Sequence, residues 1–477
     1  MAMVMDTLPT RNNLFKNISQ KRSQWIFFTL SIFSCIPLLY LFWKFDAAGF
    51  GYDIGIYRRS TIEYFHVFFD PQTPPFAFTA FSSFVLFLGD STDSFLLGWY
   101  FILTFFTTYT FGILVRKTTH SNSISVLTLL LFSTSIIQFE FFAGFYYRNL
   151  LALFLLFSTL LIIEYKSYSA CVLLIVLTAI HPLTAFVFFP TLCILGIFQK
   201  ENRKFLFTIL LIAGIGSVIF SYTEFIRYWK TLFNFLQNKE EALRYSSEFT
   251  GQFITPPQFL RFTLAYIPFA LIGIYREGKK HIFWSIFGIL NLSLIIFQFF
   301  LFERFYLFLN IFFIFFAAHG LHYIFQWFQN KKVFLVVTVA YSLFLFSAIT
   351  WYTLQKTPLI SSSDFTEIKN ISTSIPKQSF ILSFSSSDAP WLYGFAGDYK
   401  IIAPGTLHEN KWNYETWFEF WSTKDTKKRA ELLSQYDTKE IYFYASNNYK
   451  ERAKNLFSND PNISQINSHV WKYQFSL

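Results

Sequence analysis

The sequence predicts a mainly α-helical protein: a polytopic bundle of transmembrane helices followed by a small extramembrane α/β domain. Three observations predict this fold class. The chain of 477 residues is 53% hydrophobic and only 14% charged, whereas soluble domains carry about 25% charge. Apolar runs long enough to cross a bilayer recur between residues 25 and 351. After residue 351 the composition becomes polar, with short apolar runs that are typical of strands.

Composition also excludes several classes of function. The net charge of +10 is concentrated in short loops between apolar runs, which is a pattern of membrane topology and not of a nucleic-acid surface. The three cysteines, Cys35, Cys171 and Cys193, lie inside apolar runs, so neither a disulfide framework nor a metal cluster is indicated. The 68 phenylalanines suit a lipid-facing surface and packing between helices. We therefore expect the bilayer as a partner and no nucleic acid.

The first apolar run, residues 25–43, follows a polar and basic tail, residues 1–24. It is too long for the apolar part of a cleavable signal, so we expect it to remain as an anchor. Because basic residues mark the cytoplasmic side, the N-terminus is expected inside. The basic loops that follow predict nine spans, at residues 25–43, 95–115, 124–142, 150–163, 205–222, 259–275, 282–302, 305–325 and 333–351.

Two apolar segments are not expected to be simple spans. Residues 76–88 form a run of 13 residues, which suits a short interfacial helix within an outer loop that extends from residue 45 to 94. Residues 170–198 are interrupted by His181-Pro182 and have basic flanks on both sides. This pattern predicts a bent, re-entrant pair that enters and leaves on the cytoplasmic side. Residues 223–258 are expected to form a second large outer loop.

These assignments divide the chain into a cytoplasmic tail, a transmembrane domain over residues 25–351 and an extracytoplasmic α/β domain over residues 352–477. The last of these contains strand-like runs at 380–384, 400–403, 440–444 and 470–475, with helical patterns such as 426–435 between them. We expect a multi-pass protein of the cytoplasmic membrane whose C-terminal domain lies outside.

The outer loop of residues 45–94 concentrates charge in a chain that is poor in it, and Asp53 is its leading catalytic candidate. Asp53 follows the first span by about ten residues, in the sequence Gly51-Tyr-Asp, so its carboxylate is expected at the outer membrane surface. Transfer of a sugar to a hydroxyl group needs a general base near the acceptor oxygen. The alternative interpretation is a solvated or helix-capping aspartate.

Four further charged residues are expected at the same face. Glu140 lies at the outer end of a span, where an acid is costly and indicates function, unless it forms a structural pair with Arg148. Arg148 begins the next span and Arg304 precedes a late one. A guanidinium binds phosphate oxygens through parallel hydrogen bonds, so both are candidates for holding a lipid phosphate, unless they only snorkel to the interface. Arg58 is a third phosphate-binding candidate.

Three other residues are candidates for the site. His66 lies in the outer loop, and Glu303 adjoins Arg304 in the turn between two late spans. His181 is at the apex of the re-entrant pair, where a hydrogen-bonded kink residue is the more ordinary interpretation. The sequence holds no HExxH, CxxC or P-loop motif and no GxGxxG after a strand, so soluble nucleotide chemistry is not indicated.

Together these features resemble the multi-spanning membrane glycosyltransferases of the GT-C type, over nearly the whole length. The motifs that carry the resemblance are short: Asp53 in the first outer loop, the Pro-Pro helix from Thr73 to Gly89, Tyr147-Arg148, the bend at residues 179–182, Glu303-Arg304, and segments 387–391 and 397–405 of the terminal domain.

The resemblance implies an inverting transfer at the outer face, from a polyprenyl-phosphate sugar to a hydroxyl of an acceptor glycan, lipid or protein, in glycan biosynthesis of the cell envelope. It implies that Asp53 is the base, that Glu140 is a second acid, and that Arg148 and Arg304 contact the donor phosphate. The chain departs from metal-dependent members that carry a DxD-like acid pair, because two phenylalanines follow Glu140. No cofactor or metal is expected, although a divalent metal ion stays an open alternative.

Three other functions remain as alternatives. A polymerase or ligase of surface polysaccharide would use basic residues of a large outer loop, such as Arg227, Lys230 and Arg244. A transporter is less favoured because intramembrane acids are few, no inverted repeat is visible and a soluble domain follows the last span. A relative that has lost its activity would act structurally.

Overall fold

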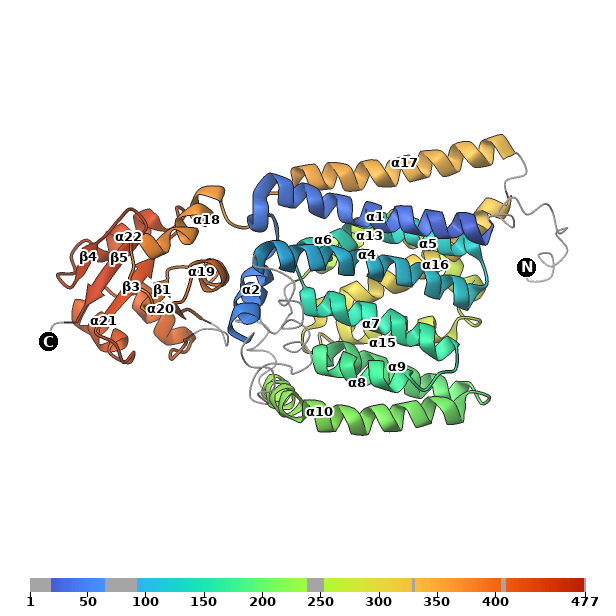
Figure 1. Ribbon diagram of the computed structural model, residues 1–477, viewed down its shortest axis with the longest axis horizontal. Helices are drawn as coiled ribbons and strands as arrows, with labels where there is room; N and C mark the ends of the chain where they lie inside the picture. The colour runs from blue at the N-terminus through green and yellow to red at the C-terminus, as the bar shows by residue number, and fades with distance from the viewer. Residues whose placement is uncertain (1–18, 65–91, 238–252, 328–330, 405–408, 476–477) are drawn as a thin grey trace.

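The computed structural model describes residues 19–64, 92–237, 253–327, 331–404 and 409–475, and it has two parts (Figure 1). Long helices lie side by side in a bundle, and a small α/β domain lies beyond one end of it, next to α2 (Asp53–Tyr64). The fold class predicted from the sequence is confirmed. The predicted helix at residues 76–88, together with His66, lies outside the described residues.

Six described helices are long and apolar enough to cross a bilayer. They are α1 (Gln20–Phe45), α4 (Thr92–Thr119), α7 (Tyr147–Glu164), α10 (Arg203–Gln237), α16 (Phe305–Trp327) and α17 (Lys331–Gln355). Two bent pairs pass the same test, α5 (Asn122–Thr134) with α6 (Ile136–Ala143), bent by 54°, and α13 (Pro256–Thr263) with α14 (Ile267–Glu277), bent by 80°. The remaining predicted span corresponds to α15 (Ile282–Ile296), which has 15 residues and is short for a simple span.

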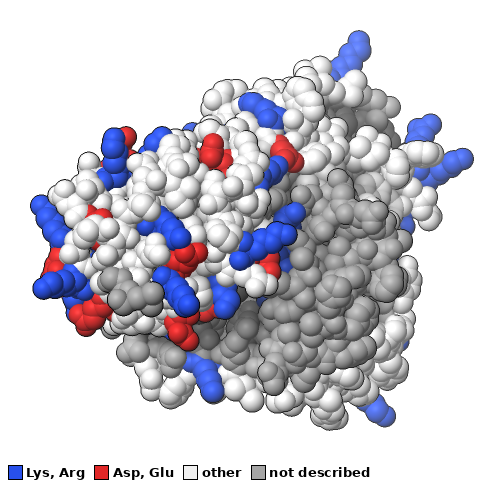
Figure 2. Space-filling view, turned by 60° about the vertical axis from the view of Figure 1, so that its left-hand side comes forward, with Lys and Arg blue, Asp and Glu red and all other residues white. Residues whose placement is uncertain are grey.

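The outward faces of the bundle are apolar. Ile219 on α10 and Val336 on α17 are 64% and 65% exposed, and both belong to longer runs of exposed apolar side chains. A surface of this kind suits lipid and not water. Figure 2 shows the contrast: Lys, Arg, Asp and Glu side chains gather on the α/β domain at left, whereas few lie on the described part of the bundle that is visible there.

A buried polar network joins the two bent pairs to α16. Ser135 has an extended backbone that ends α5, and its hydroxyl accepts from the backbone N–H of Gln138 at the start of α6 (3.3 Å). Asn310 on α16 donates to the Ser135 hydroxyl (3.2 Å), and its side-chain oxygen accepts from the Tyr266 hydroxyl at the second bend. Because polar groups in an apolar interior need partners, this network fixes both breaks against one straight helix.

The predicted re-entrant segment is a pair of helices, α8 (Ala170–Ile180) and α9 (Pro182–Phe198), which meet at His181. His181 caps α9, because its Nδ1 accepts from the backbone N–H of Thr184 (3.2 Å), and Pro182 begins the helix where no donor is needed. Arg148 Nε donates to the Ile180 carbonyl (2.9 Å). The tip of the pair therefore lies at the same end of the bundle as Arg148.

The second large outer loop differs from its prediction. The structure continues α10 past a kink at Ser221 (φ −132°, ψ 21°) as far as Gln237. Residues 223–237 are therefore helical and not loop. Their mixed charge hid the continuation, because a composition of this kind resembles a loop when it follows a strongly apolar run. Of the basic residues named for the polymerase alternative, Arg244 lies outside the described residues.

The C-terminal domain is a five-stranded mixed sheet in the order β2-β1-β3-β5-β4. Its elements are α18 (Ser362–Lys369), η4 (Ile371–Thr373), β1 (Phe380–Ser383), α19 (Ala389–Phe395), β2 (Lys400–Ile402), α20 (Tyr414–Ser422), α21 (Thr426–Leu433), β3 (Glu440–Tyr444), α22 (Lys450–Phe457), β4 (Ile463–Gln465) and β5 (Val470–Gln474). The first three strands in space are parallel, and β5 is antiparallel to both of its neighbours. The α/β character predicted from the sequence is confirmed.

The domain has its own core and a buried ion pair. Arg429 on α21 and Asp460 before β4 are 1% and 0% exposed, and their side chains pair at 2.7 Å. Four of the five strands coincide with predicted apolar runs. Strand β4 does not, because two of its three residues are exposed and polar, and it carries no alternating pattern.

Candidate active site

The position of Asp53 is set by a close backbone contact between two loops. After α1, the short helix η2 (Asp46–Gly49) leads to Gly51, whose backbone N–H donates to the Ala143 carbonyl (2.8 Å). A side chain at Gly51 would place its Cβ 2.4 Å from the Gly144 carbonyl oxygen, so only glycine fits. This contact seats the start of α2 against the turn that leads into α7. Asp53 is the first residue of α2, where the helix dipole favours a negative charge.

Two arginines from distant parts of the sequence act on the Asp53 carboxyl. Burial raises the pKa of Asp53 from 3.8 to about 6, and the charges of Arg304 and Arg148 oppose that rise. Arg148 lies in the first turn of α7, and its backbone N–H bonds the hydroxyl of Tyr57, one turn along α2 from Asp53. Arg304 lies in η3 (Phe302–Arg304), with its guanidinium 5.6 Å from the Tyr146 ring. The structure thus brings Asp53, Arg148 and Arg304 together.

Glu140 is held in a separate polar group. Both of its carboxylate oxygens accept from Lys356 Nζ at 2.7 Å, and Oε1 also accepts from the Tyr352 hydroxyl at 2.6 Å. The ion pair that the structure shows is therefore with Lys356 and not with Arg148. Tyr146 lies within electrostatic range of both Glu140 and Asp53, so the two acids flank one tyrosine. The role expected for Glu140 as a second acid stays a prediction.

The other predicted residues take different positions. Glu303 Oε2 accepts from the backbone N–H of Phe253 (3.1 Å), next to Arg304. His181 is buried and within electrostatic range of Arg148 and Arg304, as well as capping α9. Arg58 donates to the Gly394 carbonyl, and its guanidinium lies 5.0 Å from the Phe395 ring. These contacts of Arg58 are with the C-terminal domain, and its phosphate-binding role stays a prediction.

The C-terminal domain packs against α2, the helix that begins with Asp53. Helices α2 and α19 cross at Gly55 and Gly394, so closely that a Cβ at Gly55 would lie 2.1 Å from the Pro390 carbonyl oxygen. Arg59 reinforces the crossing through an ion pair with Asp398 (2.9 Å). No sequence pattern predicts this contact, because the two glycines are separated by more than three hundred residues and neither lies in a turn motif.

A matched pair of glycine substitutions tests whether this crossing positions Asp53. Gly55→Ala is expected to force α2 and α19 apart, to cost about 1–3 kcal/mol of stability as overpacking does, and to lower sugar transfer. Gly98→Ala on α4 is the control, because a Cβ there meets no atom within 4 Å. The melting temperature and the rate of sugar transfer should both fall in Gly55→Ala. Neither of these two properties should decline in Gly98→Ala. Equal behaviour of the two variants would contradict the positioning role.

Asp388 is a buried acid whose position near the start of α2 was not predicted from the sequence. It precedes α19, it is 7% exposed, and its Oδ2 has no hydrogen-bond partner within the described part of the chain. Burial raises its pKa to about 6. Tyr52, the neighbour of Asp53, is within electrostatic range of Asp388, and its ring lies 6.5 Å from that of Trp391. In the sequence, an acid between a run of serines and a proline does not by itself predict a functional site. The position of Asp388 near Tyr52 becomes apparent only from the fold.

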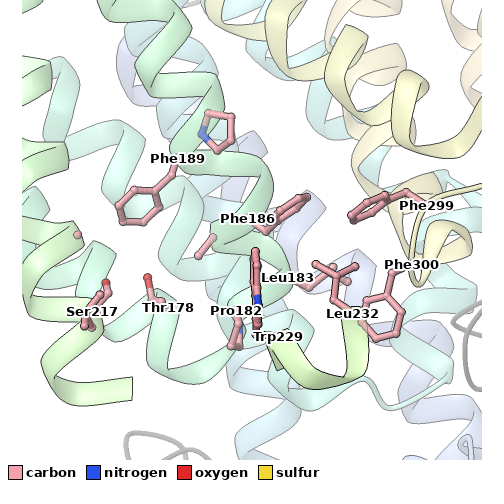
Figure 3. Close-up of a pocket in the computed structure, with 14 residues that line it drawn as sticks. Thr178, Pro182, Leu183, Phe186, Phe189, Ser217, Trp229, Leu232, Phe299 and Phe300 are labelled. Atoms are coloured by element: carbon pink, nitrogen blue, oxygen red, sulfur yellow. The ribbon is translucent and has the colours of Figure 1, made fainter. Parts of the chain in front are cut away.

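A large apolar cavity opens beside the tip of the re-entrant pair (Figure 3). Its volume is about 410 Å³, and its lining is almost entirely hydrocarbon. Figure 3 shows Pro182, Leu183, Phe186 and Phe189 of α9, Trp229 and Leu232 of α10, and Phe299 and Phe300 before η3 around it. One wall of the cavity therefore lies next to His181, and another wall is formed by the residues that precede η3, the short helix that contains Arg304. A long apolar ligand would fit it better than a sugar.

The described residues around Asp53 contain no group of three His, Cys, Asp or Glu side chains whose ligand atoms converge as a metal requires. The one such group in the described ranges, Glu277 with His281 and His319, lies at the other end of the bundle. Metal dependence at Asp53 accordingly stays open, as it was from the sequence.

Comparison with known proteins supports the fold. No family model matches the chain, and no curated protein sequence matches it. Among solved structures, the chain is similar to the crystal structure of the Archaeoglobus fulgidus oligosaccharyltransferase in complex with Zn and sulfate. The two share 13% sequence identity with a TM-score of 0.59, over 90% of this chain and 69% of that one. The likeness shows the fold: the chain described here has the GT-C fold.

Proposed function

We propose that the protein is an inverting membrane glycosyltransferase that moves a sugar from a polyprenyl-phosphate donor to an acceptor hydroxyl, with Asp53 as the general base. One observation carries the proposal: a half-buried carboxylate with a pKa raised to about 6 lies within electrostatic range of two arginines. A base of this pKa is mostly ionised at neutral pH yet basic enough to take a proton from an acceptor hydroxyl. Two guanidinium groups are the preferred partners of a phosphate.

The chemistry follows from this arrangement. The acceptor hydroxyl gives its proton to the Asp53 carboxylate as its oxygen attacks the anomeric carbon of the donor. The bond between that carbon and the phosphate oxygen breaks, and its electron pair leaves with the polyprenyl phosphate. Arg148 and Arg304 stabilise the charge that develops on the leaving phosphate. A single displacement of this kind inverts the configuration at the anomeric carbon.

The apolar cavity supplies the place for the polyprenyl chain. Its wall at Pro182 follows directly after His181, and Arg148 bonds the carbonyl of Ile180 on the same bend. A phosphate held by Arg148 and Arg304 would therefore have its hydrocarbon chain next to the cavity. His66, Glu303 and His181 remain proposed members of the site, and Glu140 and Arg58 keep the roles predicted above.

The direct test is consumption of donor. Membranes containing the protein would be supplied with a panel of polyprenyl-phosphate sugars and an acceptor fraction, and release of free polyprenyl phosphate would be measured. We expect one donor to be consumed and its sugar to appear on the acceptor. If no donor is consumed while a solute crosses sealed vesicles, the transporter alternative holds. If preassembled glycan chains are joined and single sugars are not used, the polymerase or ligase alternative holds.

Filling the cavity should discriminate between donors of different chain length. A Cβ at Gly214 meets no atom within 4 Å, and Gly214 lines the cavity, so Gly214→Leu can enter the space without a backbone clash. We expect the KM of a long-chain donor to rise by about 5- to 150-fold, the effect of about 1–3 kcal/mol of overpacking, while a donor with a very short chain is unaffected. Gly98→Leu, outside the cavity, is the control. An equal change for both chain lengths would exclude the cavity as the chain site.

A further inference from the structure

Three side chains that can bind a metal ion converge at the end of the bundle opposite Asp53. They are Glu277 at the end of α14, His281 in the turn before α15, and His319 on α16. Each offers a ligand atom, and these atoms all lie within 4.8 Å of one another. Arg304 and His319 are 15 residues apart, which along a helix corresponds to roughly 22 Å. The cluster therefore belongs to neither the Asp53 site nor its cavity.

The packing of α14 on α16 brings these residues together. A Cβ at Gly273 would lie 1.9 Å from the Phe316 carbonyl oxygen, and a Cβ at Gly320 would lie 1.9 Å from that of Phe269. The two glycines let the backbones touch, as small residues do between membrane helices. Glu277 is one turn beyond Gly273, and His319 adjoins Gly320, so the crossing places them face to face.

The turn after α14 adds the third side chain. The backbone N–H of His281 donates to the Glu277 carbonyl (3.1 Å), which closes one helical turn and places both side chains on the same side. The ring centroids of His281 and His319 are 4.6 Å apart. His322 lies one turn along α16 from His319, and its Nε2 is 2.9 Å from Gln326 Nε2.

His319 is the member that most needs a partner. It is 6% exposed, and its Nε2 has no hydrogen-bond partner among the residues that the structure describes. A buried, unpaired ring nitrogen is costly, and a metal ion would satisfy it. Glu277 is partly exposed and pairs with Lys280 at 3.0 Å, but the Lys280 side chain is 71% exposed and can leave for solvent. Exposed pairs of this kind contribute little.

The geometry points to a divalent-cation site of the zinc type, formed by Glu277, His281 and His319, at the end of the bundle away from the transfer site. Two imidazoles and one carboxylate are a ligand set that Zn²⁺ takes in proteins. The ion would fasten the turn between α14 and α15 to α16. Because α16 follows directly after Arg304, the ion would hold the helix that positions this arginine without contacting the substrate.

The test is metal binding by the purified full-length protein in detergent. After treatment with a chelator, we expect one equivalent of Zn²⁺ to rebind and to raise the melting temperature, and Co²⁺ to show the visible absorption of a nitrogen and oxygen site. Glu277→Gln and His319→Ala should each weaken binding by at least about tenfold, the smaller effect seen even for residues that only support a ligand. The control is His120→Asn, an exposed histidine with positive φ that asparagine tolerates.

The outcomes are distinct. Zinc that fails to rebind, or that binds equally well to Glu277→Gln, would overturn the site, and the three side chains would then only pack against one another. If His319→Ala aggregates, Glu277→Gln decides, because its isosteric side chain is partly exposed and keeps the packing. A variant that loses zinc but still transfers sugar would support the zinc site and leave the proposed function standing. A wild-type protein that binds zinc but transfers no sugar from any donor would contradict the proposed function and leave the zinc site standing.

Discussion

Asp53→Asn is expected to slow sugar transfer by about 10²- to 10⁴-fold, the usual contribution of a general base. Asparagine keeps the size of the side chain and can still bond the acceptor hydroxyl, but it cannot take its proton. The measurement is the rate of polyprenyl-phosphate release at saturating donor. In the wild type, kcat/KM should fall on the acid side with a midpoint near pH 6, because Asp53 must be ionised and its pKa is about 6.

The loss of activity should not come from unfolding. The pKa of Asp53 in the folded protein lies above its ordinary value of 3.8. Burial of the ionised carboxylate therefore lowers the free energy of unfolding above about pH 6, and this cost disappears below pH 3.8, where the group is protonated in both states. By this linkage Asp53→Asn should be as stable as the wild type at pH 7.5 or more stable, by at most about 3 kcal/mol. Asp46→Asn is the control, since Asp46 lies in the same loop and forms an exposed ion pair with Lys369. It should retain full activity.

Arg304→Gln is expected to reduce kcat/KM by about 10- to 150-fold, from the loss of charge-assisted hydrogen bonds worth about 1.5–3 kcal/mol. The pH profile gives a second, independent signature. The charge of Arg304 lowers the pKa of Asp53, so its removal should shift the acid limb of the profile to higher pH. Arg304 suits this test better than Arg148, whose hydrogen bonds also hold the tip of the re-entrant pair.

Arg22→Gln provides the matched control for this variant. Arg22 is an exposed arginine in the first turn of α1, at the opposite end of that helix from the outer loop. It should change neither the rate nor the pH profile. An unshifted acid limb in Arg304→Gln would show that Arg304 does not act on the group that titrates, and the proposed phosphate contact would then lose its electrostatic support.

The sequence predicted the helical class and the gathering of Asp53, Arg148 and Arg304 at one end of the bundle, whereas the assignment of that end to the outer face stays a prediction. These follow from hydropathy and from the sign of charge at helix ends, which are local properties. It did not predict that Glu140 pairs with Lys356, because that pair joins residues 216 positions apart. Nor did it predict the crossing at Gly55 and Gly394, since a close backbone contact between distant glycines leaves no periodic pattern.

Helix ends near a kink were the other source of difference. The continuation of α10 beyond Ser221 and the bend between α13 and α14 depend on packing against neighbours. The apolar cavity arises from that packing as well, because α9, α10 and the segment before η3 supply its walls. The apolar composition of each helix could be predicted from the sequence, but the cavity between the helices could not.

A single-turnover experiment tests the role of Asp53 most directly. Wild type and Asp53→Asn would each be loaded with polyprenyl-phosphate sugar before acceptor is added, so that donor binding no longer limits the rate. We expect both proteins to bind the donor equally well, the wild type to form a product of inverted configuration, and Asp53→Asn to form it at least about a hundredfold more slowly. Transfer by Asp53→Asn at the wild-type rate would contradict the assignment of Asp53 as the general base.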